Sequence, residues 1–427
     1  MKKIIHILES FFPSHKAGTE IYVYNLVKNL PKSNFESAVL ISSTDRKIKD
    51  YSFQNISVSV FHIPKTPSLK HLNGLEPPAG LEEFQKKILS LNPDIVHFHS
   101  FGRGINSYHL EWAKKQGIKT VFTTHLGGLF CIKGNLFLFE KEVCDGKVKE
   151  SRCLSCYYRK KGIPASISNI SGEIISSTPS GIKNILPPQT RLVEHRMKEL
   201  ERIRDNSDAI VALDPYIKKM YERNGITQNV NLVRQGVNMG NQPVRSKRQT
   251  VNLPLKACFI GRLYPIKGFH LLARAIDQLK SNRIELHIFT LASENEKEYF
   301  EEYKNWADSR DNVFWYEGLS QAELFTHLPD LDLVILPSLN EMAPLSVLEA
   351  FSFKVPVLGS SIPSIESNIN DGVNGRIFKV NDEADLKNRL NEIIHNPDIV
   401  KTWSSNIKKV RTSEDVAADM IKIYNSI

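Results

Sequence analysis

The sequence predicts an α/β protein with two domains, each built on a doubly wound parallel sheet. Strand-like apolar runs alternate with helical patterns over most of the chain, and this order is typical of parallel strands joined by helical crossovers. With 427 residues, the chain is too long for one ordinary hydrophobic core. The alternation stops at 238–254, a polar segment rich in Arg, Gln and Pro, which we interpret as a linker.

The first domain is expected at 1–237. Its strands are predicted at Lys3–Leu8, Ser37–Ser42, Ser57–Phe61, Asp94–His99, Thr120–Thr124 and Ala209–Leu213. Its helices are predicted at Glu20–Leu30, Leu81–Leu91, Ser107–Gln116 and Arg191–Arg204. The segment 128–192 breaks the pattern, and we interpret it as an insertion that carries four cysteines.

The second domain is expected at 255–408, followed by an amphipathic helix within 409–427. Its strands are predicted at Ala257–Ile260, Glu285–Thr290, Asn312–Tyr316, Leu333–Leu336 and Val355–Gly359. Its helices are predicted at Gly268–Leu279, Glu296–Ala307, Gln321–His327 and Pro344–Phe351. Two such sheets would face each other across a cleft, with ligands at the carboxyl ends of their strands.

Composition indicates a globular protein with anionic partners. Hydrophobic residues make up 41% and charged residues 24% of the chain, and the net charge is +9. No apolar run approaches the length of about 18 residues that a membrane-spanning helix needs. We therefore expect a cytoplasmic protein, with peripheral contact to the inner face of an anionic membrane left open. No signature of nucleic-acid binding is present.

Two glutamates define the most informative segment of the second domain. Glu341 follows the predicted strand Leu333–Leu336, and Glu349 lies within the next helix, whose first turn is expected to contain Pro344. The free N–H groups of that turn would form an anion site, beside carboxylates that accept hydrogen bonds from sugar hydroxyls. A surface helix with two solvated glutamates explains this segment alone equally well.

A basic turn is predicted at the same edge of the second sheet. In Gly261-Arg262-Leu-Tyr-Pro-Ile-Lys267-Gly268, a strand ends and a helix begins. Arg262 and Lys267 would supply the positive charge that a diphosphate needs. The alternative is a tight turn with two solvated cations.

The first domain offers two candidate sites at the ends of its strands. The loop around Gly18 could let the backbone approach a phosphate, although an ordinary loop with a helix cap at Thr19 fits as well. His125 follows the strand Thr120–Thr124 and could bind a sugar hydroxyl. We interpret His97 and His99 as structural.

The cysteines of the insertion favour metal binding over disulfides in a reducing compartment. Four thiolates suit structural zinc, and an iron–sulfur cluster or free thiols are the alternatives. Four thiolates would leave the metal no open position, so a catalytic role is not expected. The candidate ligands are Cys131, Cys144, Cys153 and Cys156.

Taken together, these motifs resemble the retaining glycosyltransferases of family 4. Glu341-x7-Glu349 is similar to the E-x7-E signature of that family, and Gly261-Arg262…Lys267-Gly268 to its basic donor-phosphate motif. Further similarities lie at Gly18-Thr-Glu20, Pro93-Asp-Ile-Val-His97, Thr124-His125, Gly318, Pro356-Val357 and Asp371-Gly372-x-Asn374-Gly375. The cysteine-bearing insertion resembles a subset of the family found in bacterial surface-polysaccharide pathways.

The resemblance implies the GT-B fold, with a nucleotide-sugar between two Rossmann-like domains and the last helix crossing back to the first. It implies transfer of a hexose-type sugar from a UDP- or GDP-sugar to a saccharide or lipid-linked acceptor, without a catalytic metal. For the phosphates, the resemblance implies contacts from the side chains of Arg262 and Lys267, from the backbone of Ala343, Pro344 and Leu345, and from the Gly18 loop. For the sugars, it implies that Glu349 binds the ribose and that Glu341 and His125 bind the donor sugar.

Three positions depart from the family pattern: Ala17 replaces a glycine, Leu126 an aspartate and Lys354 a glycine. Leu126 leaves details of the first-domain site open. The alternatives are a nucleotide-sugar epimerase on the same two-domain plan and a non-catalytic, zinc-stapled binding protein.

Overall fold

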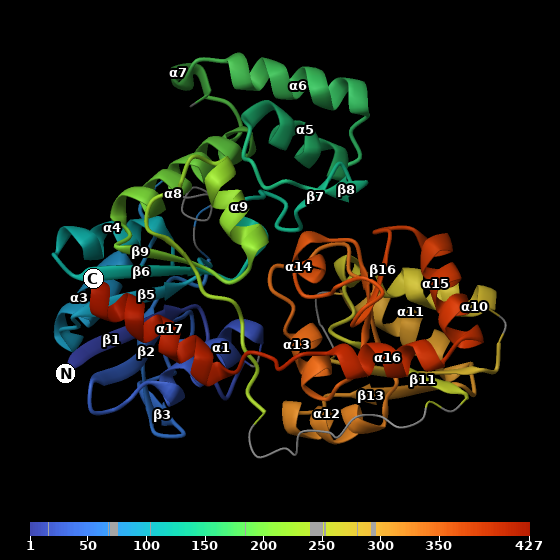
Figure 1. The fold of residues 1–427 in the computed structure, drawn as a ribbon. Helices are drawn as coiled ribbons and strands as arrows, with labels where there is room; N and C mark the ends of the chain where they lie inside the picture. Colours follow the sequence, from blue (N-terminus) through green and yellow to red (C-terminus); the bar gives the residue numbers. More distant parts are fainter. Residues whose placement is uncertain are drawn as a thin grey trace. The chain divides into compact units, whose positions relative to one another are not determined.

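The computed structural model describes residues 1–15, 17–66, 68, 76–102, 104–183, 185–239, 251, 253–279, 281–291 and 296–427. The chain divides into two compact units (Figure 1). Unit 1 comprises 1–140, 144–234 and 413–427, and unit 2 comprises 141–143 and 235–412. Most of the predicted linker, 238–254, lies outside the described residues.

Unit 1 is built on an eight-stranded sheet with the order β10-β9-β6-β5-β1-β2-β4-β3. Neighbouring strands are parallel except for β3, which pairs antiparallel with β4. The strands are β1 (Lys2–Leu8), β2 (Phe35–Ser43), β3 (Tyr51–Phe53), β4 (Ile56–His62), β5 (Ile95–His99), β6 (Lys119–Thr124), β9 (Ala209–Ala212) and β10 (Val230–Leu232). The interior strands β5 and β9 are buried along their whole length, as expected for a sheet covered on both faces.

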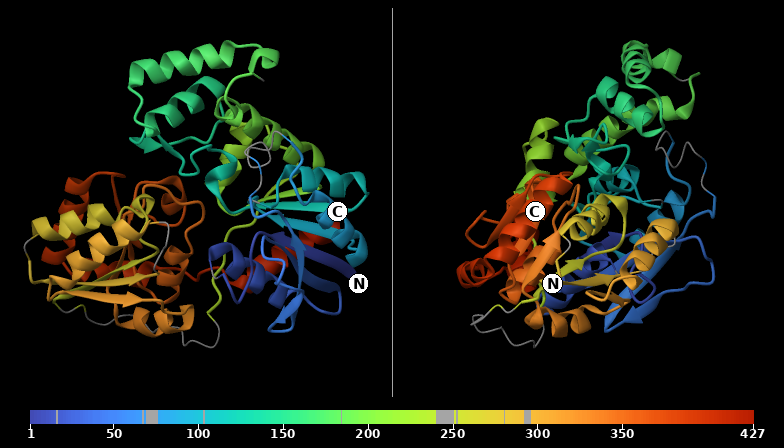
Figure 2. Two further views of the ribbon diagram at one scale, coloured as in Figure 1. Left: turned by 180° about the vertical axis from the view of Figure 1, so that it is seen from behind. Right: turned by 90° about the vertical axis from the view of Figure 1, so that its right-hand side faces the viewer.

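Helices connect the parallel strands of unit 1. They are α1 (Gly18–Asn29), α3 (Leu81–Leu91), α4 (Ser107–Lys115), α8 (Leu192–Asn206) and α9 (Pro215–Arg223). The predicted insertion follows β6 and contains more helix than its polar composition suggested. Its elements are η1 (Gly127–Leu129), β7 (Phe137–Leu138), β8 (Glu142–Val143), α5 (Glu150–Lys160), α6 (Ala165–Ser177), α7 (Ser180–Lys183) and η2 (Pro188–Arg191). Helix α6 lies on the side of α5 that faces away from the eight-stranded sheet (Figures 1 and 2).

The last helix, α17 (Ser413–Ser426), belongs to unit 1. In the sequence, the 178 residues 235–412 of unit 2 separate it from the rest of unit 1. It packs against α1. The ammonium group of Lys2 donates to the Tyr424 carbonyl oxygen at 2.7 Å. The Tyr424 hydroxyl lies 2.7 Å from His97 Nδ1 in the core, so buried polar contacts hold the end of the chain to β1 and β5.

Unit 2 is built on a six-stranded, fully parallel sheet with the order β13-β12-β11-β14-β15-β16. The strands are β11 (Leu255–Ile260), β12 (Ile284–Thr290), β13 (Val313–Glu317), β14 (Leu333–Leu336), β15 (Val357–Ser360) and β16 (Gly375–Phe378). The helices are η3 (Pro265–Lys267), α10 (Phe269–Leu279), α11 (Lys297–Asp308), α12 (Gln321–His327), η5 (Leu328–Asp330), α13 (Leu345–Ser352), α14 (Pro363–Glu366), α15 (Glu383–His395) and α16 (Asp398–Asn406). The predicted α/β class with doubly wound parallel sheets is therefore confirmed.

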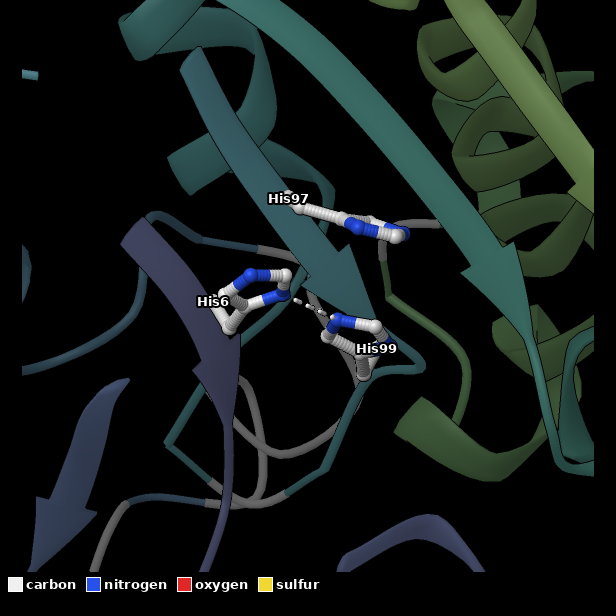
Figure 3. Close-up of side chains that lie close together, drawn as sticks. All are labelled: His6, His97 and His99. Atoms are coloured by element: carbon white, nitrogen blue, oxygen red, sulfur yellow. Dashed lines mark hydrogen bonds between the residues drawn. The ribbon is translucent and has the colours of Figure 1, made fainter. Parts of the chain in front are cut away.

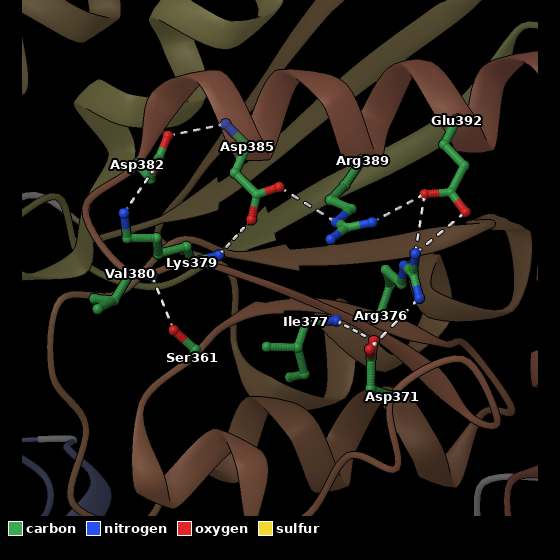
Figure 4. Close-up of polar contacts among 10 residues, drawn as sticks. All are labelled: Ser361, Asp371, Arg376, Ile377, Lys379, Val380, Asp382, Asp385, Arg389 and Glu392. Carbon is green, nitrogen blue, oxygen red and sulfur yellow. Dashed lines mark hydrogen bonds and ion pairs between the residues drawn. The ribbon is translucent and has the colours of Figure 1, made fainter.

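A polar network fastens the edge strand β16 to α15 (Figure 4). The Asp371 carboxylate accepts the Ile377 N–H at 2.8 Å and pairs with Arg376, which also pairs with Glu392 of α15. The Lys379 N–H donates to Asp385 at 2.6 Å. These side chains are partly exposed, so each ion pair contributes little by itself, and the backbone hydrogen bonds fix the register.

Candidate functional site

Two loops meet at the carboxyl edge of the unit 2 sheet. One follows β11 and the other follows β14, and these strands are neighbours although β12 and β13 separate them in sequence. The Leu339 N–H donates to the Ile266 carbonyl oxygen at 2.8 Å. Gly268 has φ +68°, and a Cβ atom there would lie 1.9 Å from the Pro337 carbonyl oxygen. Only glycine allows this approach, so Gly268 sets the spacing of the two loops.

Lys267 and Glu341 come together across these loops. The Lys267 ammonium group lies 2.5 Å from Glu341 Oε1, and the Ser338 hydroxyl donates to the same oxygen at 2.8 Å. The Glu341 side chain is 15% exposed and the Lys267 side chain 29%. The ammonium group has three N–H donors, so two remain for a ligand after Glu341 has accepted one.

Serine side chains hold the Glu341 loop from a third strand end. The Ser364 hydroxyl of α14 donates to the Glu341 carbonyl oxygen at 2.8 Å. The Ser360 hydroxyl, at the end of β15, donates to the Ser338 carbonyl oxygen at 2.5 Å. Glu341 is thus fixed by residues that follow β11, β14 and β15, and sequence reasoning had assigned no role to these serines.

Arg262 lies five residues before Lys267, but it does not take part in the ion pair of Lys267 with Glu341. No acidic side chain in the described part of the chain forms an ion pair with its guanidinium group, which lies 5.8 Å from the centre of the Tyr264 ring. An unpaired guanidinium group keeps all five N–H donors for an anionic ligand.

Glu349 is buried in α13, with 8% of its surface exposed. The Gln321 side chain of α12 donates to its Oε1 at 2.6 Å. Burial raises the pKa of Glu349, and the hydrogen bond from Gln321 offsets part of that rise. The solvated-glutamate alternative is therefore wrong for this residue. Gln321 lies 28 residues before Glu349, and no sequence motif marks it.

Helix α13 begins one residue later than predicted. Pro344 is its N-cap, with extended backbone (φ −71°, ψ 107°), and Leu345 is its first helical residue. Ala343 lies in the preceding loop. Proline's fixed φ suits both positions, so the sequence could not separate them. The first-turn N–H groups, beginning with that of Leu345, have no acceptor within the helix.

In unit 1, His125 directly follows β6 and is packed among buried aromatic rings. The backbone N–H of His125 donates to the Ser100 hydroxyl at 2.8 Å. The centre of the His125 ring lies 4.8 Å from that of the Tyr22 ring. Burial lowers the pKa of His125 to about 3, so the imidazole is neutral at pH 7. A neutral imidazole has one donor and one acceptor nitrogen.

Three further histidines, His6, His97 and His99, lie close together in the core (Figure 3), and His99 links them to His125. His99 Nδ1 lies 3.2 Å from His125 Nε2, and His99 Nε2 lies 3.1 Å from His6 Nδ1. Ring nitrogens of His6, His97 and His99 lie within 4.8 Å of one another, as in a metal site. However, the two ring nitrogens of His97 already contact the hydroxyls of Thr123 and Tyr424. The two ring nitrogens of His99 contact the other imidazoles His6 and His125. Burial lowers the pKa of His6, His97 and His99. The group is therefore best described as packed, neutral imidazoles, in agreement with the structural role predicted for His97 and His99.

Gly18 is the first residue of α1, and Ala17 is its N-cap, so the cap does not lie at Thr19. The Glu20 side chain accepts the Ala17 N–H at 3.0 Å. A Cβ atom at Gly18 would meet nothing within 4 Å, so packing within the described chain does not require a glycine there. The approach of a phosphate to the backbone at Gly18 stays a prediction.

The four cysteines of the insertion line one small cavity of about 20 Å³, together with Phe130, Ile132, Lys133, Phe137 and Leu138. All four thiols are free. The Phe139 N–H lies 3.1 Å from Cys156 Sγ. Burial raises the pKa of Cys144 to about 11 and also raises that of Cys153. No three of these sulfur atoms lie within 4.8 Å of one another.

Comparisons with known proteins agree with this architecture. Residues 17–145 match the family described as Glycosyltransferase Family 4, and residues 243–410 match Glycosyl transferases group 1. An uncharacterized glycosyltransferase of Methanocaldococcus jannaschii is 24% identical over 207 residues, which are 48% of this chain and 54% of that protein. A D-inositol 3-phosphate glycosyltransferase of Streptosporangium roseum is 25% identical over 89% of this chain and 81% of its own length.

Two further similarities concern a polysaccharide enzyme and a solved structure. A lipopolysaccharide 1,2-N-acetylglucosaminetransferase of Salmonella typhimurium is 27% identical over 44% of this chain and 53% of its own length. The crystal structure of Anabaena Alr3699/HepE in complex with UDP-glucose has a TM-score of 0.66 and 13% identity, and the match covers all of both chains. It supports the fold. The two family matches and the two Rossmann-like parallel sheets identify the chain as a member of glycosyltransferase family 4, with the GT-B fold.

Proposed function

We propose that this protein is a retaining glycosyltransferase of cell-surface polysaccharide synthesis. It moves a hexose-type sugar from a UDP- or GDP-sugar to a saccharide or lipid-linked saccharide. The observation that carries the proposal is the meeting of Lys267, Glu341 and the start of α13 at one sheet edge. Arg262 lies in the same loop as Lys267 and has no acidic partner among the described residues.

Each of these groups has a role in sugar transfer. When the nucleotide leaves, negative charge grows on its β-phosphate, and Arg262, Lys267 and the first N–H groups of α13 stabilise that charge. The buried Glu349 carboxylate accepts hydrogen bonds from the ribose hydroxyls. Glu341, held between Lys267 and Ser338, accepts one from the donor sugar, and the neutral imidazole of His125 contacts the same sugar.

The similarity to proteins with related substrates supports the donor and acceptor classes. One structural neighbour was solved with UDP-glucose, and one relative is named as a lipopolysaccharide sugar transferase. Positive charge from Arg262 and Lys267 takes the place of Mg²⁺ at the diphosphate, so the proposed reaction uses no catalytic metal.

The test is a donor screen followed by product analysis. A set of UDP- and GDP-sugars is scored by thermal shift, and the best donor is incubated with saccharide acceptors. Proton NMR of the product should give the anomeric configuration of the donor. An inverted product would refute retention, conversion of the donor without acceptor would indicate an epimerase, and absence of any turnover with a bound donor would favour a non-catalytic protein.

The second part of the proposal is a structural zinc ion held by Cys131, Cys144, Cys153 and Cys156. It is supported by four free thiols at a single cavity with room for about one water-sized particle. The four thiolates would hold zinc as a closed structural site and leave the ion no open position. The ion would fasten α5 to the loop before it. Burial raises the pKa of Cys144, so its thiol would lose its proton to solvent only as the sulfur binds the metal.

Zinc binding predicts a defined metal content. Protein purified under reducing conditions should contain about one zinc ion per chain by mass spectrometry. Cys153→Ser/Cys156→Ser should lose it and melt at a lower temperature, whereas Cys258→Ala, which changes a buried cysteine of β11, should keep it. A strong zinc chelator should lower the Tm of wild type but not of the double variant. Wild-type protein that takes up no zinc, or a double variant that retains it, would contradict the assignment, and EDTA should not stop turnover before the protein unfolds.

A further inference from the structure

Helix α6 presents a row of aliphatic side chains to solvent. Ile167, Ile170 and Ile174 are 54%, 60% and 62% exposed. Their spacing of three and four residues places them on one face of the helix. Exposed isoleucines are unfavourable in water, so a continuous row of them indicates a surface that another partner covers.

The opposite face of α6 is fixed against α5. Ser168 is fully buried, and a Cβ atom at Gly172 would lie 2.3 Å from the Ser155 hydroxyl and 2.5 Å from the Ser151 carbonyl oxygen. Small residues therefore let the two helices approach closely. The isoleucines cannot turn toward α5 without losing this packing, so their exposure follows from the fold of the insertion.

The exposed aliphatic side chains are concentrated in this part of unit 1. Among the described residues, 15 large hydrophobic side chains are exposed, and five of them lie within 167–185. Besides the three of α6, these are Ile182 in α7 and Ile185 just after it, with 52% and 84% exposure. Such a cluster differs from the scattered apolar residues found on every protein surface.

Positively charged residues flank α6 in the sequence. Lys160 and Lys161 end α5, a few residues before α6, and both are exposed. Lys183 is buried and paired with Glu150, so it adds little. Glu173 is the one acidic residue in the sequence from 159 to 185, against four basic residues. The surrounding charge therefore favours an anionic partner.

We propose that the α6 face, formed by Ile167, Ile170 and Ile174, docks on the surface of an anionic lipid bilayer. The isoleucines would enter the boundary between headgroups and acyl chains, and Lys160 and Lys161 would contact lipid phosphates. Protein interfaces are enriched in Tyr, Trp, Phe and Met, whereas this face is aliphatic and rimmed by serines. No described helix is long and apolar enough to cross a membrane. The inference deepens the proposed action on lipid-linked acceptors.

Vesicle flotation tests docking without using sugar transfer as the readout. Wild-type protein should float with phosphatidylglycerol/phosphatidylethanolamine vesicles and much less with pure phosphatidylcholine. Ile167→Ser/Ile170→Ser/Ile174→Ser should lower the partition coefficient at least tenfold. Lys160→Glu/Lys161→Glu should also weaken binding and reduce its salt dependence. The matched control, Ile48→Ser/Leu89→Ser/Val373→Ser, changes three exposed hydrophobic residues elsewhere and should bind like wild type.

Circular dichroism and Tm verify that the variants are folded, and turnover with a water-soluble acceptor should be unchanged by the α6 substitutions. Equal flotation of the α6 variant and the control would overturn the proposal. So would a wild-type dimer that the α6 substitutions convert to monomers, because the face would then be a protein interface. Failure of flotation with intact turnover would refute docking alone, whereas intact flotation without turnover would refute the proposed function alone.

Discussion

Lys267→Ala is expected to lower turnover by about 10²- to 10³-fold, the usual effect of removing one charged group that stabilises a transition state. The ammonium group is held 2.5 Å from Glu341, at the start of the loop that leads to α13. Its loss removes charge stabilisation from the leaving nucleotide and also frees Glu341 from its cation. Initial rates with the best donor of the screen measure the effect.

The fold should survive this substitution. Lys267 is 29% exposed, and the contact between its loop and the Glu341 loop depends on the backbone and on Gly268. The Tm should therefore change by only a few degrees. Lys267→Met keeps the apolar stem and tests the charge by itself. Lys401→Ala, at an exposed lysine of α16, is the matched control and should keep full activity. Near wild-type turnover in both Lys267 variants would remove Lys267 from the phosphate site.

The parallel sheets could be predicted well because buried strands carry continuous apolar runs. Leu333–Leu336 and Leu81–Leu91 were placed without error, and most other boundaries differ by one or two residues. Short edge strands such as β3 and β10 were missed because they have few buried residues. Helix α6 was missed because serine has a weak helical preference and its packing face consists of small residues.

The site was harder to predict because its contacts join distant parts of the chain. Both Lys267 and Glu341 could be placed at strand ends from the sequence, but their ion pair depends on β11 and β14 being neighbours in the sheet. The partner of Glu349 comes from α12, which carries no motif of its own. Sequence patterns locate strand ends, whereas side-chain partners depend on how the strands and helices are packed.

Glu349→Gln should weaken nucleotide binding by about 10- to 100-fold, because hydrogen bonds to a charged acceptor contribute about 1.5–3 kcal/mol. Glutamine has nearly the same shape, and its carbonyl oxygen can still accept the hydrogen bond from Gln321. Isothermal titration with UDP or GDP, whichever the donor screen selects, measures the loss. Because donors bind less tightly, KM should rise more than kcat falls.

The same substitution should make the protein more stable at neutral pH. Burial raises the pKa of Glu349 in the folded state above that of the unfolded chain, so the folded state binds the proton more tightly. Stability is then lost as pH rises from about 4.5, the ordinary pKa, through the raised value. Glutamine does not ionise, so its Tm should exceed that of wild type by a few degrees at pH 7 to 8, and the difference should shrink as pH approaches 4.5.

Nucleotide binding should follow the opposite trend with pH. In wild type, affinity should fall as pH decreases through the raised pKa, because the protonated carboxyl group is a weaker acceptor for ribose hydroxyls. The Gln variant should lack this step, and any decrease that both proteins share would belong to another group. A purely structural glutamate would change Tm without changing nucleotide affinity. Unchanged affinity with a higher Tm would therefore assign Glu349 a structural role, while the combination of higher Tm, weaker binding and a missing pH step would place the ribose at its carboxylate.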